Sequence, residues 1–172
     1  MRDMRIAALA AAYADGSLTP TRLVEEILIA HAASADLNIW IVPPDVEALR
    51  ARACELEASG PTPAQLLWGI PFAVKDNIDV ADLPTTASCK AFAHPVDASA
   101  PVVQALLDAG AIMVGKTNLD QFATGLNGTR SDYGICRNAF DPDYLAGGSS
   151  SGSAVAVALG LASFSLGTDT AG

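Results

Sequence analysis

The chain has 172 residues, of which 51% are hydrophobic and 17% charged, enough apolar material for a domain with a buried core. Its 19 Asp and Glu residues outnumber its 10 Lys and Arg residues and give a net charge of −9. Because this charge repels phosphate backbones and anionic lipid headgroups, we expect neither nucleic acid nor a membrane surface as a partner.

The N-terminal part of the chain has helical patterns. The Ala-rich run 6–14 is too weakly hydrophobic for a signal peptide, which favours a cytoplasmic protein. Thr19 followed by Pro20 is typical of the start of a helix. A further helix is expected to open at Pro44 and to end at Gly60.

The pattern then changes to short apolar runs. Residues 70–74, 111–114 and 163–166 each read as a buried strand, and a helix with Ser99 as its N-cap is expected to run to Gly110. Strands that alternate with helices predict an α/β sheet with helices packed on its faces.

A Gly/Ser-rich segment, residues 147–153, precedes a helix-competent run at 154–159. Such a segment offers free backbone N–H groups and hydroxyls. A flexible linker is disfavoured because an apolar helix and strand follow directly, and a phosphate loop lacks its Gly-Lys-[Ser/Thr] ending. The segment also interrupts the uncharged stretch 145–168, so a buried loop, helix and strand are favoured over a membrane span.

Two other segments, each at the end of a predicted strand, contain groups that are suited to catalysis. Lys75 follows an apolar strand, where burial disfavours the ammonium and makes a neutral amine available as a base. Judged by position alone, a surface lysine or an ion-pair partner remains the alternative. The turn 169–172 follows another strand, and its successive N–H groups suit an oxyanion hole.

Taken together, these segments resemble the amidase-signature family. The matching blocks, in order, are 69–77 (GIPFAVKDN), 84–86 (PTT), 115–118 (GKTN), 147–154 (GGSSSGSA) and 167–172 (GTDTAG). The resemblance implies a mixed sheet covered by helices on both faces. Residues 1–60 would then be a helical cover and residues 61–172 the core of one amidase-signature domain whose remainder lies beyond residue 172.

The resemblance also implies a Ser-Ser-Lys triad. Lys75 would be the base and Ser149 the bridging serine on a cis peptide bond, with Ser150 as a supporting hydrogen-bonding residue. The oxyanion hole would consist of the backbone N–H groups of Thr170, Ala171 and Gly172. In the family the nucleophilic serine directly follows the residue that matches Gly172, so we expect this chain alone to be inactive.

Within the family, residues 118–130 and Ser151 look like those of allophanate hydrolases. This similarity implies cytoplasmic hydrolysis of allophanate in urea breakdown, with a functional link to a urea carboxylase. Gly125 and Asn127 are candidates to contact a small polar substrate, although a Gly-containing helix end explains them equally well. Ser88 stands where relatives carry Gly, which leaves the geometry of that loop open.

Several alternatives stay open at this point. The chain would also suit another small-amide hydrolase, an A-type amidotransferase subunit, or a non-catalytic binding module. A homodimer is one assembly left open. Three widely spaced cysteines with no CxxC pair, and His residues without ligand-spaced companions, predict no metal site, and nothing indicates a cofactor.

Overall fold

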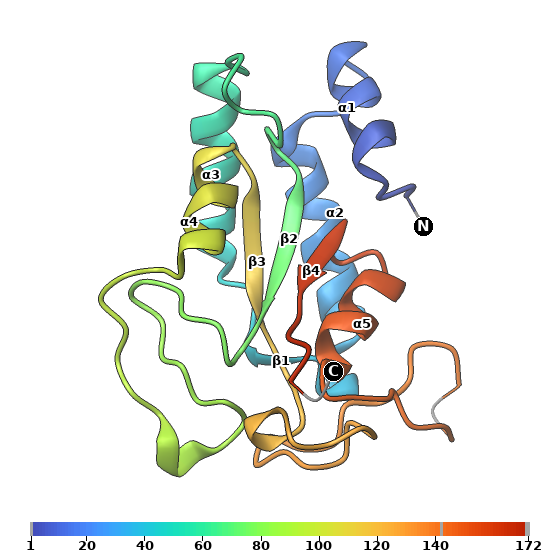
Figure 1. Cartoon of the computed structure of the whole chain (residues 1–172). Coiled ribbons are helices and arrows are strands. Elements are labelled where there is room, and N and C mark those ends of the chain that lie inside the picture. Colours follow the sequence, from blue (N-terminus) through green and yellow to red (C-terminus); the bar gives the residue numbers. More distant parts are fainter. Residues whose placement is uncertain (1, 142, 171–172) are drawn as a thin grey trace.

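The structure, a computed structural model, describes residues 2–141 and 143–170 (Figure 1). Its longer helices are α1 (Ile6–Ala14), α2 (Pro20–Ala33), α3 (Val46–Ser59), α4 (Pro101–Asp108) and α5 (Ser151–Ala158). Short 3-10 helices lie at Ala35–Leu37, Lys90–Phe92 and Gln121–Ala123. The strands are β1 (Trp40–Val42), β2 (Pro71–Lys75), β3 (Ile112–Thr117) and β4 (Phe164–Leu166).

The strands form one mixed sheet in the order β1-β3-β2-β4. Strand β2 pairs in parallel with both β3 and β4, whereas β1 pairs antiparallel with the end of β3. The connections from β2 to β3 and from β3 to β4 each contain a helix, as connections between parallel strands require. The predicted mixed α/β sheet is confirmed, and β1 is a strand that the sequence patterns did not predict.

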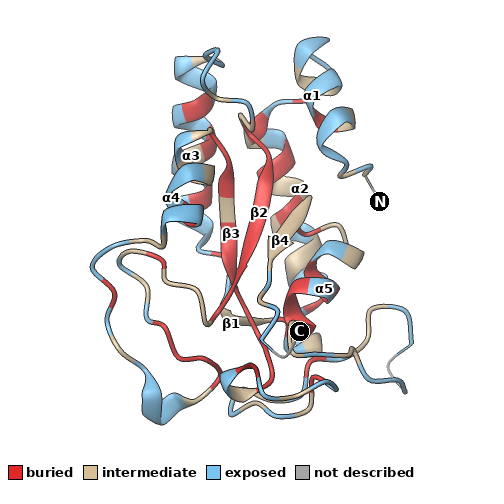
Figure 2. Cartoon of the chain, in the orientation of Figure 1, coloured by how far each residue is buried: buried red, intermediate tan, exposed pale blue. Residues whose placement is uncertain are grey.

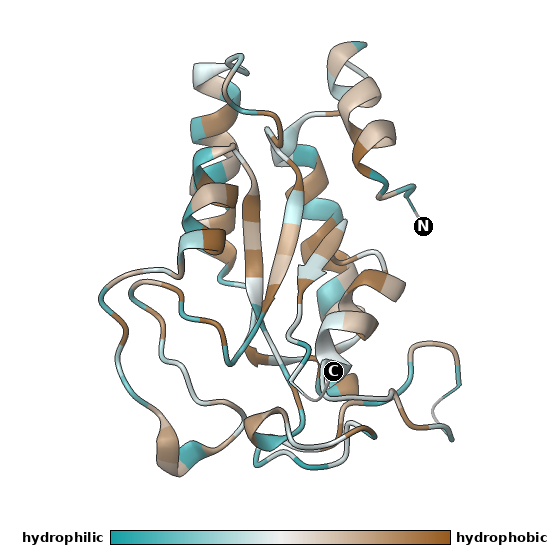
Figure 3. Cartoon of the chain, in the orientation of Figure 1, coloured by the Kyte–Doolittle hydropathy of each residue, from teal (hydrophilic) through white to brown (hydrophobic). Residues whose placement is uncertain are grey.

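Helices cover both faces of the sheet. On one face, Phe72 and Val74 of β2 pack with Val103 of α4. On the other, Ile70 and Val114 join a cluster contributed by α1 and α2. Strands β2 and β3 are therefore buried and apolar along most of their length, while the outer faces of the helices are exposed and more polar (Figures 2 and 3).

The helix ends test the capping predictions. Thr19 caps α2 as expected, by accepting a hydrogen bond from the Arg22 N–H, and Gly60 ends α3. The prediction for Pro44 was off by two residues, because the Asp45 side chain caps a helix that begins at Val46.

Two further local predictions were wrong. Ser99 does not cap α4; its hydroxyl accepts a hydrogen bond from the Ala81 N–H, and Ala100 precedes the helix. Helix α5 begins at Ser151, inside the segment predicted as a loop, because Ser151 to Ser153 pack as buried residues. Within residues 2–141 and 143–170, no helix is long and apolar enough to cross a membrane.

The loop around Ser88 adopts an unusual backbone. Ser88 has a φ of 62°, in the left-handed region where glycine is favoured, and it is fully buried. Its hydroxyl lies 3.1 Å from Asn118 Oδ1 and 2.6 Å from Ser131 Oγ. Ser88 thus keeps the conformation that a glycine would adopt easily, and the hydrogen bonds of its side chain offset part of the strain.

Candidate active site

The carboxyl ends of the parallel strands meet at one edge of the sheet, at the lower side of Figure 1. Strand β2 ends at Lys75, and β4 is followed closely by Thr168. Ser149 lies just before α5, which packs against β2, β3 and β4. Ligand sites of open α/β sheets commonly form at this edge, so a functional site is expected here.

Lys75 lies among hydroxyl groups. Its Nζ is 2.8 Å from Ser149 Oγ and 2.8 Å from Thr168 Oγ1. The Asn77 side-chain amide in turn donates to Thr168 Oγ1 at 3.1 Å. Lys75 and Ser149 are 74 positions apart in the sequence, and the fold brings them into hydrogen-bonding contact.

The environment of Lys75 favours the neutral amine. Its side chain is 0% exposed, and this burial lowers the pKa of Lys75 below its ordinary value, while the charge of Asp120 opposes the shift by raising it. Both 2.8 Å partners are hydroxyl oxygens, and a hydroxyl can donate to a free amine as well as accept from an ammonium. The contact between Lys75 Nζ and Ser149 Oγ thus has the length and the chemical groups that a proton transfer between these side chains would require.

A second buried lysine, Lys116, has different hydrogen-bonding partners from those of Lys75. Lys116 Nζ lies 3.0 Å from Asp76 Oδ1, and it donates to the Pro84 carbonyl at 2.7 Å and to Thr85 Oγ1 at 2.9 Å. Burial lowers the pKa of Lys116 as well, and the Asp76 carboxylate opposes part of this shift. Three acceptors use all three N–H groups of an ammonium, so Lys116 is suited to a structural ion pair and Lys75 to proton transfer.

Ser149 lies on a loop whose backbone is hydrogen-bonded to the turn after β3. The Gly148–Ser149 peptide bond is cis, as the family resemblance implies, and the Ser149 carbonyl accepts a hydrogen bond from the Asp120 N–H at 3.0 Å. Ser150, the predicted supporting residue, immediately precedes α5, and a Cβ added to Gly167 would come within 3.0 Å of its Oγ. The predicted roles of Ser149 and Ser150 in catalysis stay predictions.

A pocket of about 500 Å³ opens beside the lysine–serine pair. It is lined by Ala123, Thr124, Gly125, Leu126, Gly148, Ser149, Thr168, Asp169 and Thr170. Gly125, a candidate substrate contact, lines this pocket, and its contact with a substrate stays a prediction. Asn127 instead lines an adjacent hollow of about 280 Å³, together with Thr129 and Arg130, and shares no pocket with Ser149.

The structure describes one of the three residues of the predicted oxyanion hole. Thr170 lies at the rim of the pocket with Ser149, whereas Ala171 and Gly172 fall outside the described residues. Of the residues that the sequence analysis did not single out, Thr168 and Asp120 contribute most. Thr168 lies in the matched block 167–172, and Asp120 lies in the segment 118–130. Their positions just after strands were the signal available for finding them.

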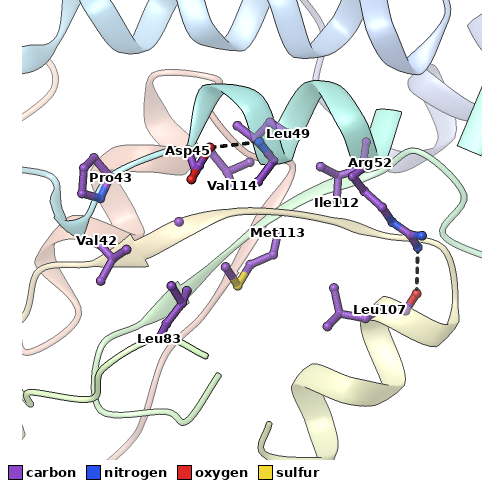
Figure 4. Close-up of a pocket in the computed structure, with 12 residues that line it drawn as sticks. Val42, Pro43, Asp45, Leu49, Arg52, Leu83, Leu107, Ile112, Met113 and Val114 are labelled. Carbon is purple, nitrogen blue, oxygen red and sulfur yellow. Dashed lines mark hydrogen bonds between the residues drawn. The ribbon is translucent and has the colours of Figure 1, made fainter. Parts of the chain in front are cut away.

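Another hollow, of about 270 Å³, lies between α3 and β3 and has an apolar lining (Figure 4). Its charged residues are already engaged, since Asp45 accepts from the Ala48 N–H and Arg52 donates to the Leu107 carbonyl. It shares no lining residue with the pocket beside Ser149. Among the described residues, no group of three or more His, Cys, Asp or Glu side chains is arranged to hold a metal ion.

These features define an α/β protein with a buried lysine in contact with a half-buried serine at the carboxyl ends of its parallel strands. The family model described as Amidase matches residues 22–172, and the chain belongs to the amidase family.

Individual relatives give a finer picture. The chain is 49% identical over 151 residues to urea amidolyase of Saccharomyces cerevisiae, covering 88% of this chain but 8% of that protein. It is 46% identical over 131 residues to the A-type subunit of glutamyl-tRNA(Gln) amidotransferase from Solidesulfovibrio magneticus, covering 74% of this chain and 26% of that protein. The solved allophanate hydrolase of Kluyveromyces lactis superposes with a TM-score of 0.83 at 41% identity, over 98% of this chain and 28% of that one.

Proposed function

We propose that this chain is the N-terminal part of an amidase domain that hydrolyses allophanate and releases ammonia. The observation that carries the proposal is the 2.8 Å contact between the fully buried Lys75 amine and Ser149 Oγ at the wall of a pocket. Burial keeps this amine available as a base. A cytoplasmic location stays a prediction from the sequence.

The proposed mechanism is acyl transfer through a proton relay. Neutral Lys75 takes a proton from Ser149, and Ser149 takes one from a nucleophilic serine that would follow Gly172. The attacked carbonyl becomes an oxyanion, which the backbone N–H groups of Thr170, Ala171 and Gly172 would stabilise. The relay then returns a proton to the leaving amine, and water hydrolyses the acyl-enzyme.

The choice of substrate rests on the names of the relatives and on the residues of the pocket. Urea amidolyase of Saccharomyces cerevisiae and allophanate hydrolase of Kluyveromyces lactis are among the similar proteins, and the first name supports a urea-related substrate. The functional link to a urea carboxylase stays a prediction from the sequence. The pocket residues Thr124, Thr168 and Thr170 offer hydroxyls to a small polar amide. Because the chain spans 8% of the urea amidolyase, residues elsewhere in a full-length protein would complete recognition.

A second candidate is an A-type amidotransferase subunit, which the 46% identity to the Solidesulfovibrio magneticus protein favours. Such a protein would use the same relay on a glutamine side-chain amide. The two functions differ in substrate and not in the Lys75–Ser149 chemistry. A substrate comparison therefore separates them.

The test is ammonia release by the full-length protein that carries this chain, with allophanate and glutamine as separate substrates. We expect allophanate to give the higher kcat/KM, and Lys75→Ala and Ser149→Ala each to lower kcat by roughly 1,000-fold or more while KM changes little. Lys90→Ala is the matched control, since Lys90 is exposed. A preference for glutamine would select the amidotransferase, and normal turnover by Lys75→Ala would refute the relay.

A further inference from the structure

A buried carboxylate lies directly behind the pocket wall. Asp120 is 0% exposed and belongs to the turn that follows β3. Its Oδ2 accepts the Gly128 N–H at 2.9 Å, and its Oδ1 accepts the Arg130 N–H at 2.9 Å. Its own N–H donates to the Ser149 carbonyl at 3.0 Å. Through these bonds Asp120 joins the 125–130 loop to the backbone of Ser149.

Glycines allow this close approach. A Cβ added to Gly148 would lie 2.1 Å from Asp120 Oδ2, and one added to Gly125 would lie 2.4 Å from Asp120 Cγ. A Cβ on Gly128 would lie 2.5 Å from the Gly147 carbonyl oxygen. The 125–130 loop and the loop that carries Ser149 are therefore packed around the carboxylate with no room for side chains at these positions.

The two loops that Asp120 joins both line the pocket, with Gly125 and Leu126 from one loop and Gly148 and Ser149 from the other. A change at Asp120 would therefore alter the width of the pocket and the position of the Ser149 hydroxyl relative to Lys75. Displacements of about 1 Å in such arrangements can cost about 100-fold in rate.

We propose that Asp120 is a positioning residue for the Lys75–Ser149 pair. Its hydrogen bonds fix the Ser149 backbone and the 125–130 loop relative to each other. This inference rests on the proposed amidase function. Asp120 does not touch the reacting atoms; it acts through the backbone of Ser149 and through its charge.

The charge of Asp120 supplies a readout that a merely structural residue would not change. The anion raises the pKa of Lys75 against the effect of burial, so its removal should lower that pKa further. The charged residues that line the pocket or the adjacent hollow are Asp169, Asp120 and Arg130. Asp76, which follows Lys75 in the sequence, is paired with Lys116. A pH titration therefore distinguishes loss of the anion from a general loosening of the loop.

The experiment compares Asp120→Asn with the wild type in the full-length protein. We expect kcat for allophanate to fall about 100-fold, and the acid limb of kcat/KM to move to lower pH. Asp132→Asn is the matched control: Asp132 is exposed, and its carboxylate also accepts a backbone N–H, that of Lys90 at 3.0 Å. A kcat within about twofold of the wild type would overturn the proposal.

A second measurement does not depend on turnover. The Lys75 side chain is titrated by NMR in protein with isotopically labelled lysine, and its signal is assigned by its loss in Lys75→Arg. We expect the pKa of Lys75 to fall in Asp120→Asn and to stay unchanged in Asp132→Asn. An unchanged Lys75 pKa in Asp120→Asn overturns the proposal even if turnover falls. If the wild type hydrolyses no amide, the proposed function fails, and this titration alone decides the role of Asp120.

Discussion

The buried ion pair between Lys116 and Asp76 offers a sharp test of the fold around the site. Both side chains are 0% exposed, and Lys116 Nζ lies 3.0 Å from Asp76 Oδ1. At that separation and an effective dielectric constant of about 20, the Coulomb attraction is about 5–6 kcal/mol. Replacing Lys116 by Met keeps most of its volume. It leaves the buried carboxylate of Asp76 with Thr86 as its hydrogen-bonding partner among the described residues.

Lys116→Met is therefore expected to lower the free energy of unfolding by about 3–5 kcal/mol, because it leaves the buried charge of Asp76 without its ion-pair partner. For a protein of this size, such a loss corresponds to roughly 10 °C in the unfolding midpoint. The assay is urea unfolding followed by the fluorescence of Trp40 and Trp68. Lys90→Met is the control. It is expected to lower stability by about 1 kcal/mol or less, because Lys90 is exposed and the substitution removes a cation–π contact at 5.2 Å from the centre of the Tyr133 ring.

A double-mutant cycle measures how much of this loss comes from the unpaired charge of Asp76. Adding Asp76→Asn to Lys116→Met removes the carboxylate charge and should recover about 1 kcal/mol or more relative to Lys116→Met alone. If the effects of the two substitutions simply added, or if Lys116→Met were as stable as Lys90→Met, the ion pair would not stabilise this part of the fold.

Three further outcomes are expected. Lys75→Arg in the full-length protein should be as inactive as Lys75→Ala, because guanidinium stays protonated and cannot act as a base; substantial ammonia release by the Arg variant would contradict this. Wild-type kcat/KM should fall as the pH falls through the lowered pKa of Lys75, since the protonated amine accepts no proton, and a pH–rate profile measures this limb. Gly148→Ala should lower both the unfolding midpoint and kcat, because its Cβ would lie 2.1 Å from Asp120 Oδ2; a thermally normal, active variant would show that the loops around Asp120 are loosely packed.

The local features of the fold could be predicted from the sequence because they depend on neighbouring residues. Thr19 and Gly60 mark helix ends through hydrogen bonds and backbone conformations within a few positions. Apolar runs located β2, β3 and β4 to within two or three residues, because continuous burial requires continuous hydrophobicity. Motif resemblance indicated that Lys75 and Ser149 belong together, although no local pattern connects them.

Tertiary packing decided the rest. β1 is three residues long, and its pairing with Thr117 and Lys116, more than seventy positions away, leaves no local periodicity to detect. The two lysines at strand ends, Lys75 and Lys116, look alike in sequence. Only the side chains around each amine distinguish Lys75, which contacts hydroxyl groups, from Lys116, which is paired with a carboxylate. Asp120 acquires its position behind the pocket because distant glycines leave space for it, which depends on distances in three dimensions that no local sequence pattern records.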